Sequence, residues 1–191
     1  MRKLIFFMHT SLDGFVAGVN GELNWAKLDE EMFDFVATMT AQADTALYGR
    51  VTYELMQSYW PTAGNKPNAS KHDKEHSAWY AKVAKVVLST TMSEEGLENT
   101  TVIGDHLADN INSIKNQDGK NILIFGSPRA SHSLLHLGLI DEFWVFVNPI
   151  LLGIGMPLFK GVTEITKLNL LESITFPCGV IALHYETKRD K

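Results

Sequence analysis

The sequence predicts one α/β domain of three layers, with helices on both faces of a mixed central sheet and an antiparallel hairpin at the C-terminal end. Strand-like apolar runs alternate with helix-like amphipathic runs along most of the 191 residues, and the last two strand-like segments follow one another directly. Alternating strands and helices favour parallel pairing under two layers of helices, whereas consecutive strands pair antiparallel. The length fits a single domain over residues 1–191, without an internal repeat or a linker.

The N-terminal half begins with an apolar run over residues 3–9, which predicts a buried strand ending at the sequence SLDG. From Asp29 to about Ala43, apolar side chains recur every three or four positions behind an acidic first turn, which predicts a helix. A strand over residues 45–48 and a short helix over residues 50–58 follow. Residues 60–71 are rich in Pro, Gly, Asn and Ser, and they predict a loop long enough to serve as a lid.

The second half predicts the remaining elements in the same way. Helices are expected over residues 72–82 and through Ile111 and Ile114, and strands over residues 83–88, 101–103, 121–125 and 142–147. Ser127 is the predicted N-cap of a helix that has Pro128 at its first position and stops at Gly138. Residues 168–174 and 180–187 predict the closing antiparallel pair.

The composition excludes several classes of protein. A formal charge of −5 provides no basic field of the kind that nucleic-acid binding needs. Cys178 is the one cysteine and cannot form an intramolecular disulfide, and the N-terminal apolar stretch is too short for a signal peptide. No apolar run approaches the roughly 20 residues that span a bilayer. We therefore expect a cytoplasmic protein that binds neither nucleic acid nor a membrane.

Several predicted strands run directly into a helix start or a small-residue turn. This happens at Gly49-Arg50-Val51-Thr52, at Ser89-Thr90-Thr91 and at Gly126-Ser127-Pro128-Arg129. Helix N-termini offer unpaired N–H groups and a positive dipole end, and glycine lets a phosphate come close to the backbone. Two such ends, each beside an arginine, suit a diphosphate. The alternative is that these residues only form the turns between strands and helices, and that the arginines only contact solvent.

Four segments resemble a known family. LYGRVTYE is similar to the Gly-Arg-x-Thr-(Trp/Tyr)-Glu element of dihydrofolate reductases, and VVLSTT to the strand of that fold that ends in hydroxyl residues. TSLDGFVAG and the segment from FGSPRASH to GIGMPLF resemble the reductase domain of riboflavin biosynthesis. The resemblance implies a dihydrofolate-reductase-like fold and an NADPH-dependent reductase. Its substrate would be a small heterocyclic or ribosylamino-pyrimidine compound, as for a 5-amino-6-(5-phosphoribosylamino)uracil reductase.

The resemblance also implies the residues that hold the cofactor. The diphosphate and 2′-phosphate side is expected to be held by Gly49, Arg50 and Thr52, and the adenosine ribose by Ser89 and Thr90. The other face of the diphosphate is expected to be held by Gly126, Ser127, Pro128, Arg129 and Ala130. The family usually has further glycines where this chain has Ser127-Pro128. Serine lacks the freedom of glycine at positive φ and proline lacks an N–H, so this departure is expected to reduce the affinity for a dinucleotide.

On the substrate side, Asp29 resembles the carboxylate with which dihydrofolate reductases bind and protonate a pterin. Asp13 is the second catalytic candidate, and Ser11, Gly14 and Trp25 are the candidates for substrate binding. The cleft is expected between SLDG, the first helix and residues 60–71. The alternatives are that Asp29 is only an acid in the first turn of a helix and that Asp13 only forms a turn.

Other functions remain as alternatives or are excluded. His72 to His76 spells the zinc pattern H-x-x-E-H, but no third ligand is evident, so no metal site is expected. Ser131-His132-Ser133 lies inside a predicted helix, which disfavours a hydrolase triad. Without a zinc-deaminase motif the chain is at most the reductase half of the riboflavin enzyme. A reductase of a pterin or small carbonyl compound and a non-catalytic nucleotide-binding module remain possible. The strand FWVFV resembles family segments near a two-fold contact, so a homodimer is expected.

Overall fold

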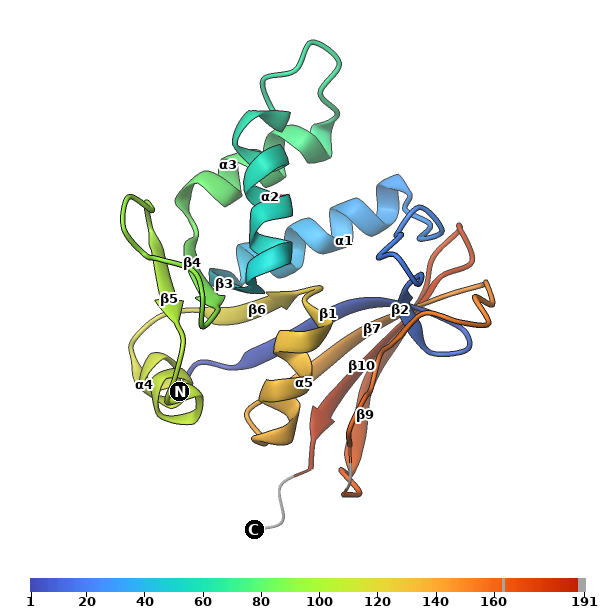
Figure 1. Ribbon diagram of the computed structural model, residues 1–191. Helices are drawn as coiled ribbons and strands as arrows, with labels where there is room; N and C mark the ends of the chain where they lie inside the picture. Colours follow the sequence, from blue (N-terminus) through green and yellow to red (C-terminus); the bar gives the residue numbers. More distant parts are fainter. Residues whose placement is uncertain (163, 189–191) are drawn as a thin grey trace.

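The main element of the fold is an eight-stranded sheet with the order β5-β4-β3-β6-β1-β7-β10-β9 (Figure 1). The computed structural model describes residues 1–162 and 164–188. The strands from β5 to β7 are parallel, β10 is antiparallel to both of its neighbours, and all the parallel strands end at one edge. The strands are β1 (Leu4–Ser11), β3 (Ala43–Gly49), β4 (Ala84–Leu88), β5 (Thr100–Ile103), β6 (Asn121–Phe125), β7 (Glu142–Asn148), β9 (Leu168–Thr175) and β10 (Ile181–Thr187).

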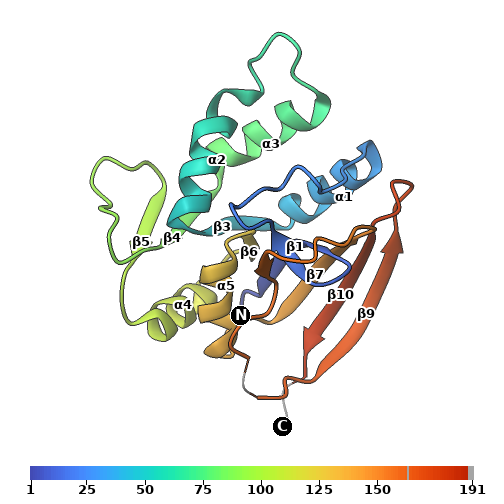
Figure 2. The ribbon, with the colours of Figure 1, turned by 45° about the vertical axis from the view of Figure 1, so that its right-hand side comes forward.

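Helices cover both faces of this sheet, as Figures 1 and 2 show. On one face lie α1 (Glu30–Ala41), α2 (Arg50–Ala63) and α3 (Lys71–Lys82), and on the other lie α4 (Leu107–Asn116) and α5 (Pro128–His136). A separate pair, β2 (Phe15–Ala17) and β8 (Met156–Pro157), was not predicted. The three-layer fold, the mixed sheet and the closing hairpin of β9 and β10 are confirmed.

The central strand β1 shows why an uninterrupted apolar run becomes a strand here. Successive side chains of a strand point to opposite faces, and both faces of β1 are covered by helices. Ile5 and Phe7 therefore lie in the core below α1, while Leu4 and Phe6 lie in the core that contains α5 residues. Because β1 is paired with β6 on one side and β7 on the other, its end lies in the middle of the sheet edge.

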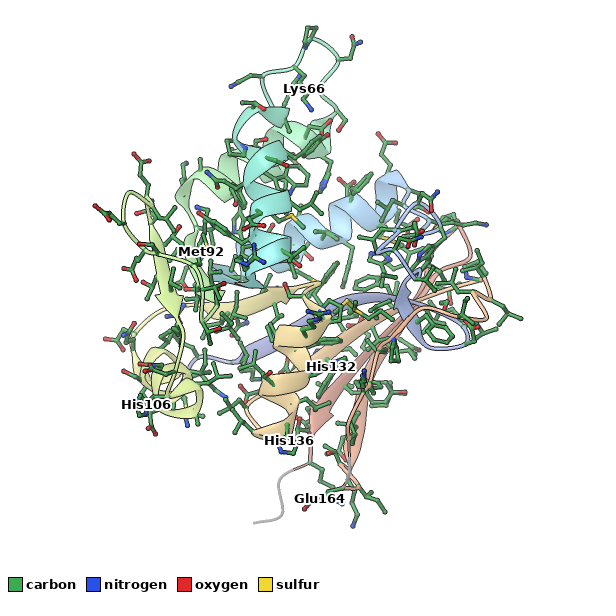
Figure 3. The ribbon with its side chains drawn as sticks, viewed as in Figure 1. Lys66, Met92, His106, His132, His136 and Glu164 are labelled. Carbon is green, nitrogen blue, oxygen red and sulfur yellow. The ribbon has the colours of Figure 1, made fainter. Side chains whose placement is uncertain are left out.

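The predicted loop over residues 60–71 is wrong in extent, because α2 continues through Pro61 to Ala63. Tertiary contacts explain the longer helix: the Ser77 hydroxyl donates to the Trp60 carbonyl at 2.8 Å and accepts from the Gly64 N–H at 2.9 Å. These bonds offset the helix-breaking tendency of proline. The remaining turn ends at Ser70, which caps α3, and its Lys66 lies away from the sheet (Figure 3). This turn does not cover the sheet edge as a lid.

Candidate cofactor and substrate site

The two glycine-containing helix starts lie next to each other at the edge where the parallel strands end. β3 and β6 are neighbours in the sheet, but α2 leaves β3 toward one face and α5 leaves β6 toward the other (Figure 1). Adjacent strands whose connections go to opposite faces form a topological switch point, the usual ligand position in open α/β sheets. The fold therefore places two helix N-termini around one position.

Direct contacts confirm that these two starts are close together. The Gly49 N–H donates to the Ser127 hydroxyl at 2.9 Å. A Cβ built on Gly49 would lie 3.5 Å from the Ala130 Cβ, and one on Gly126 would lie 3.8 Å from the Thr52 methyl group. The structure thus brings together the predicted diphosphate residues of both turns.

Ser127 occupies the N-cap position of α5 but does not cap that helix with its side chain, which corrects the predicted capping bond. Its hydroxyl instead donates to the Phe125 carbonyl at 3.2 Å and accepts from Gly49. Ser127 has φ +57°, a conformation that favours glycine. Since Pro128 has no N–H, the first turn of α5 can present only the N–H groups of Arg129 and Ala130 to an anion.

The charged and hydroxyl candidates lie around this position. Arg50 is exposed and forms an ion pair with Glu54 at 2.8 Å, one turn along α2. Such an exposed pair is weak, so the guanidinium can turn to a stronger anion. Arg129 is exposed at the start of α5. The Ser89 hydroxyl, directly after β4, accepts from the N–H groups of Thr91 and Met92. Thr90, the next residue after Ser89, is exposed.

Asp13 holds together two loops at the end of β1. Its carboxylate accepts from the Ser11 hydroxyl at 2.6 Å and from the N–H groups of Leu152 and Gly153 at 3.1 and 2.7 Å. The hydrogen bond from Ser11, followed by those from the backbone, lowers the pKa of Asp13. Gly14 next to it has φ +86°, as this turn requires. An ionised, fully bonded carboxylate is a poor proton donor, and this geometry favours a positioning role.

Asp29 has a similar structural role at the start of α1. One oxygen accepts from the Met32 N–H at 2.9 Å, and the other accepts from the Cys178 N–H at 3.0 Å. The bond from Met32 lowers the pKa of Asp29. The side chain therefore caps α1 and fastens it to the turn before β10. Trp25 lies nearby in sequence and donates its indole N–H to the Glu22 carbonyl at 2.9 Å.

Sequence reasoning missed two polar residues at this edge, His9 in β1 and Asn148 at the end of β7. Asn148 is completely buried, and its amide nitrogen lies 3.3 Å from the His9 Nδ1. The His9 ring stacks on Phe146 with a centroid distance of 5.0 Å. The available signal was a histidine inside an otherwise apolar strand, two residues before Ser11.

The histidines of the H-x-x-E-H pattern pack against aromatic rings. The His76 ring lies 4.1 Å from that of Trp60, and the His72 ring stacks on Phe33 at 4.1 Å. Burial lowers the pKa of His76 to about 3. Within residues 1–162 and 164–188, no three His, Cys, Asp or Glu side chains are arranged to hold a metal ion.

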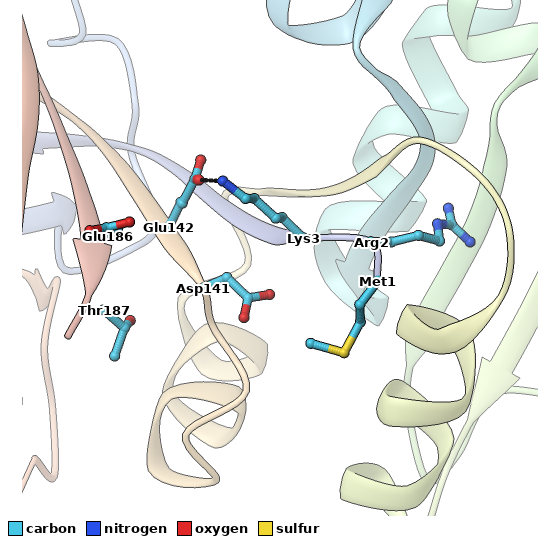
Figure 4. Close-up of a pocket in the computed structure, with 7 residues that line it drawn as sticks. All are labelled: Met1, Arg2, Lys3, Asp141, Glu142, Glu186 and Thr187. Atoms are coloured by element: carbon cyan, nitrogen blue, oxygen red, sulfur yellow. Dashed lines mark hydrogen bonds and ion pairs between the residues drawn. The ribbon is translucent and has the colours of Figure 1, made fainter. Parts of the chain in front are cut away.

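Two cavities lie away from the starts of α2 and α5. One, of about 250 Å³, lies between the first turns of α1 and α3 and is lined by Phe33 and His72 among others. The second, of about 260 Å³, lies at the opposite edge of the sheet, where β1 and β7 begin (Figure 4). Its Lys3 and Glu142 form an ion pair, and Glu142 also contacts His184 at 3.0 Å. Mutual pairing of its charged groups makes this second cavity a structural feature more than a ligand site.

Comparison with known proteins identifies the family. A family model described as the RibD C-terminal domain matches residues 2–182. The chain belongs to this family. The uncharacterized protein YyaP of Bacillus subtilis is 33% identical over 187 residues, covering 96% of this chain and 94% of YyaP. No helix among the described residues has both the length and the apolar character needed to cross a membrane.

Solved structures agree with membership in the RibD C-terminal domain family. A protein of Shewanella sp. PV-4 assigned to riboflavin biosynthesis has a TM-score of 0.73 and 27% identity, covering 98% of this chain and 99% of that one. The Thermotoga maritima deaminase and 5-amino-6-(5-phosphoribosylamino)uracil reductase has a TM-score of 0.68 at 15% identity, covering 98% of this chain and 57% of its own. Dihydrofolate reductase of Enterococcus faecalis with NADP(H) has a TM-score of 0.63 at 14% identity, covering 98% and 97%.

These similarities confirm the dihydrofolate-reductase-like fold and the resemblance to the riboflavin-pathway reductase domain. Among these solved structures, the Thermotoga maritima protein is named as a deaminase and reductase, and the Enterococcus faecalis dihydrofolate reductase was solved as a complex with NADP(H).

Proposed function

We propose that this protein is an NADPH-dependent reductase that transfers a hydride to a small heterocyclic compound of the ribosylamino-pyrimidine type. The observation that carries the proposal is the pair of helix starts at the switch point between β3 and β6, joined by the bond from Gly49 to Ser127. Two positive dipole ends around one position suit a diphosphate. Membership in a reductase family supports the same assignment.

The residues divide this work between the two ends of a dinucleotide. The first-turn N–H groups of α2 and α5 would bind the diphosphate, with Arg129 adding charge-assisted hydrogen bonds there and Arg50 adding them on the 2′-phosphate side. Ser89 and Thr90, on the neighbouring strand end, would contact the adenosine ribose and its 2′-phosphate. When bound, the nicotinamide supplies the hydride, and the protein contributes orientation and exclusion of water.

The test is thermal unfolding of the protein with NADPH, with NADH and without a ligand. A ligand that binds only the folded state at a hundred times its Kd stabilises by about 2.7 kcal/mol. NADPH should stabilise more than NADH, and Arg129→Ala should reduce the effect. His136→Ala is the matched control, because His136 is exposed in the last turn of the same helix, as Figure 3 shows. Equal shifts with both cofactors would contradict the assignment of NADPH.

A non-catalytic nucleotide-binding module is the second candidate, and the left-handed Ser127 followed by Pro128 favours it. These residues stand where the family pattern has glycines, so the second turn offers fewer N–H donors. NADPH oxidation measured with dihydrofolate, small carbonyl compounds and 5-amino-6-ribosylaminouracil derivatives separates the candidates. Stabilisation by NADPH without turnover of any of them would favour the module.

We also propose a homodimer, and the structure changes the surface on which it would form. β7, with the sequence FWVFV, lies inside the sheet, and its Phe143 and Phe146 are in the core. The edge strand β9 instead exposes Leu168, Leu170 and Leu171. Exposed leucines on an unpaired edge favour pairing with a second copy. Light scattering should give a dimer for the parent and a monomer for Leu170→Lys.

We place this protein in the cytoplasm, as its composition predicts. Fractionation of cells that express the full chain tests this placement, and recovery of the protein with the membrane fraction would contradict it.

A further inference from the structure

His9 lies near the end of β1, at the edge where the parallel strands of the sheet end. It belongs to the carboxyl-terminal half of β1, on the face of the sheet that α1 covers. Its ring stacks on Phe146 and meets the edge of Phe7, at centroid distances of 5.0 and 5.9 Å. The ring is therefore held in one orientation by aromatic neighbours.

Hydrogen bonds determine which nitrogen of this ring carries the proton. The Lys27 N–H donates to the Asn148 Oδ1 at 2.9 Å, so the other end of that amide is the NH₂ group. This NH₂ group also faces the carbonyl oxygens of Thr10 and Phe146, at 3.2 and 3.1 Å, which can only accept. The two hydrogens of this NH₂ group are shared among three neighbours, and its nitrogen cannot accept, so a hydrogen on the His9 Nδ1, 3.3 Å away, would meet another donor. We therefore infer that Nδ1 carries no hydrogen and that the hydrogen is on Nε2.

The ring is also neutral under ordinary conditions. Burial lowers the pKa of His9 to about 4, because the charged form loses its hydration. A proton on Nδ1 would in addition face the Asn148 NH₂ group, which cannot accept it. His9 is thus a fixed hydrogen-bond donor and not an acid near neutral pH.

The Nε2–H group has no acceptor within residues 1–162 and 164–188. The hydrogen bonds of His9 in this part of the chain involve Nδ1. No side-chain nitrogen or oxygen of the described residues is both fully buried and without a partner. Nε2 must therefore reach an accessible surface, although most of the ring is enclosed. An oriented donor without a protein acceptor is suited to an acceptor on a ligand.

We propose that His9 is a substrate-binding residue that donates its Nε2–H to a carbonyl oxygen or ring nitrogen of a planar heterocycle. The buried Phe7 and Phe146 rings fix the plane of the His9 ring, and a heterocycle of the proposed ribosylamino-pyrimidine type offers carbonyl and ring-nitrogen acceptors in one plane. Asn148 and the Lys27 backbone are positioning groups that keep the donor on Nε2. The inference rests on the reductase proposal, because it names how the substrate of that same site is recognised.

The tautomer can be measured on the unmodified protein. Two-bond ¹⁵N–¹H correlation spectra of histidine-labelled protein distinguish the two neutral tautomers and the imidazolium. His9 should be the Nε2–H tautomer and should stay neutral to about pH 4. An Nδ1–H tautomer, or protonation of His9 with an unperturbed pKa, would overturn the inference.

Binding of lumazine, a planar pteridine dione with carbonyl acceptors, tests the function of the donor. The lumazine Kd would be measured by fluorescence on protein saturated with NADPH, for the parent and for His9→Phe. Phenylalanine preserves the stacking on Phe146 and leaves the Asn148 NH₂ group its two carbonyl acceptors, so the fold is preserved. Loss of one neutral hydrogen bond should weaken binding about 3- to 10-fold.

Two further variants complete the experiment. His9→Gln places an amide donor near the position of Nε2 and should restore part of the affinity. His136→Phe makes the same chemical change on an exposed position of α5 and should bind lumazine as the parent does. Equal lumazine affinity for parent and His9→Phe, or no lumazine binding by the parent, would overturn the inference. Stabilisation by NADPH alone, measured separately on each variant, reports on the reductase proposal independently.

Discussion

Replacement of Ser127 tests how the two helix starts are held together. Its hydroxyl joins the end of β3 to the turn after β6, accepting from Gly49 and donating to the Phe125 carbonyl. Its φ of +57° is strained for any residue with a Cβ. Ser127→Ala removes the hydrogen bonds and keeps the strain, whereas Ser127→Gly removes both.

The expected magnitudes follow from these two terms. Each of the two hydrogen bonds contributes about 0.5–1.5 kcal/mol net, so Ser127→Ala should lower the free energy of unfolding by about 1–3 kcal/mol. Glycine relieves about 1–2 kcal/mol of left-handed strain but adds entropy of about 0.4–1 kcal/mol to the unfolded chain. Ser127→Gly should therefore be about 0.5–1 kcal/mol more stable than Ser127→Ala.

Urea unfolding followed by tryptophan fluorescence measures both differences, and the slope of free energy against urea should not change. If Ser127→Ala unfolds at the parent midpoint, the hydroxyl does not join the two turns. If Ser127→Ala is more stable than Ser127→Gly, the left-handed conformation is wrong. Stabilisation by NADPH of the Gly variant should equal or exceed that of the parent, because a glycine stands there in the family pattern.

Three further predictions concern pH, capping and cofactor choice. His9 and His76 have pKa values of about 4 and about 3 when folded, below the unfolded value near 6.5, so stability is full above pH 6.5 and should fall as the pH decreases toward 4. Urea unfolding against pH checks this, and His76→Phe should lessen the loss. Asp29→Ala should lower the melting temperature more than Asp29→Asn, since the amide oxygen of Asn still caps α1 and only the acceptor for the Cys178 N–H is lost; equal losses would contradict capping. Arg50→Ala should remove about tenfold of the preference for NADPH over NADH in thermal-shift titrations, while loss of the exposed pair with Glu54 costs only about 0.3–0.5 kcal/mol.

The contact between the two glycine turns could be predicted because its signals are local. A strand, a glycine turn and a helix start follow one another within a few residues at Gly49 and at Gly126, and each boundary has its own residue type. The fold then places β3 beside β6, which brings the two turns into contact. The end of α2 was missed because Ser77, which supports it, belongs to another helix.

The polar contacts around the end of β1 and the start of α1 could not be predicted in the same way, because they join distant parts of the chain. The Asn148 amide meets His9 across 139 residues of sequence, and Asp29 meets the Cys178 N–H across 149. No periodicity or spacing within a segment reports such a pair. Asp13 and Asp29 were recognised as residues of interest, but the N–H groups that occupy their oxygens became evident only in the fold.

This difference has a consequence for how function varies in proteins of this kind. The proposed diphosphate position depends on helix starts that the strands themselves fix, so it can persist while the loops around the end of β1 change. The proposed substrate position depends on His9, on the Asn148 amide and on the loops and helix start that Asp13 and Asp29 hold by hydrogen bonds. Substitution of one of these side chains would reorient an acceptor or donor without disturbing the helix starts. Related chains that keep NADPH binding are therefore expected to differ in their substrates, and a screen should hold NADPH constant while varying the heterocycle.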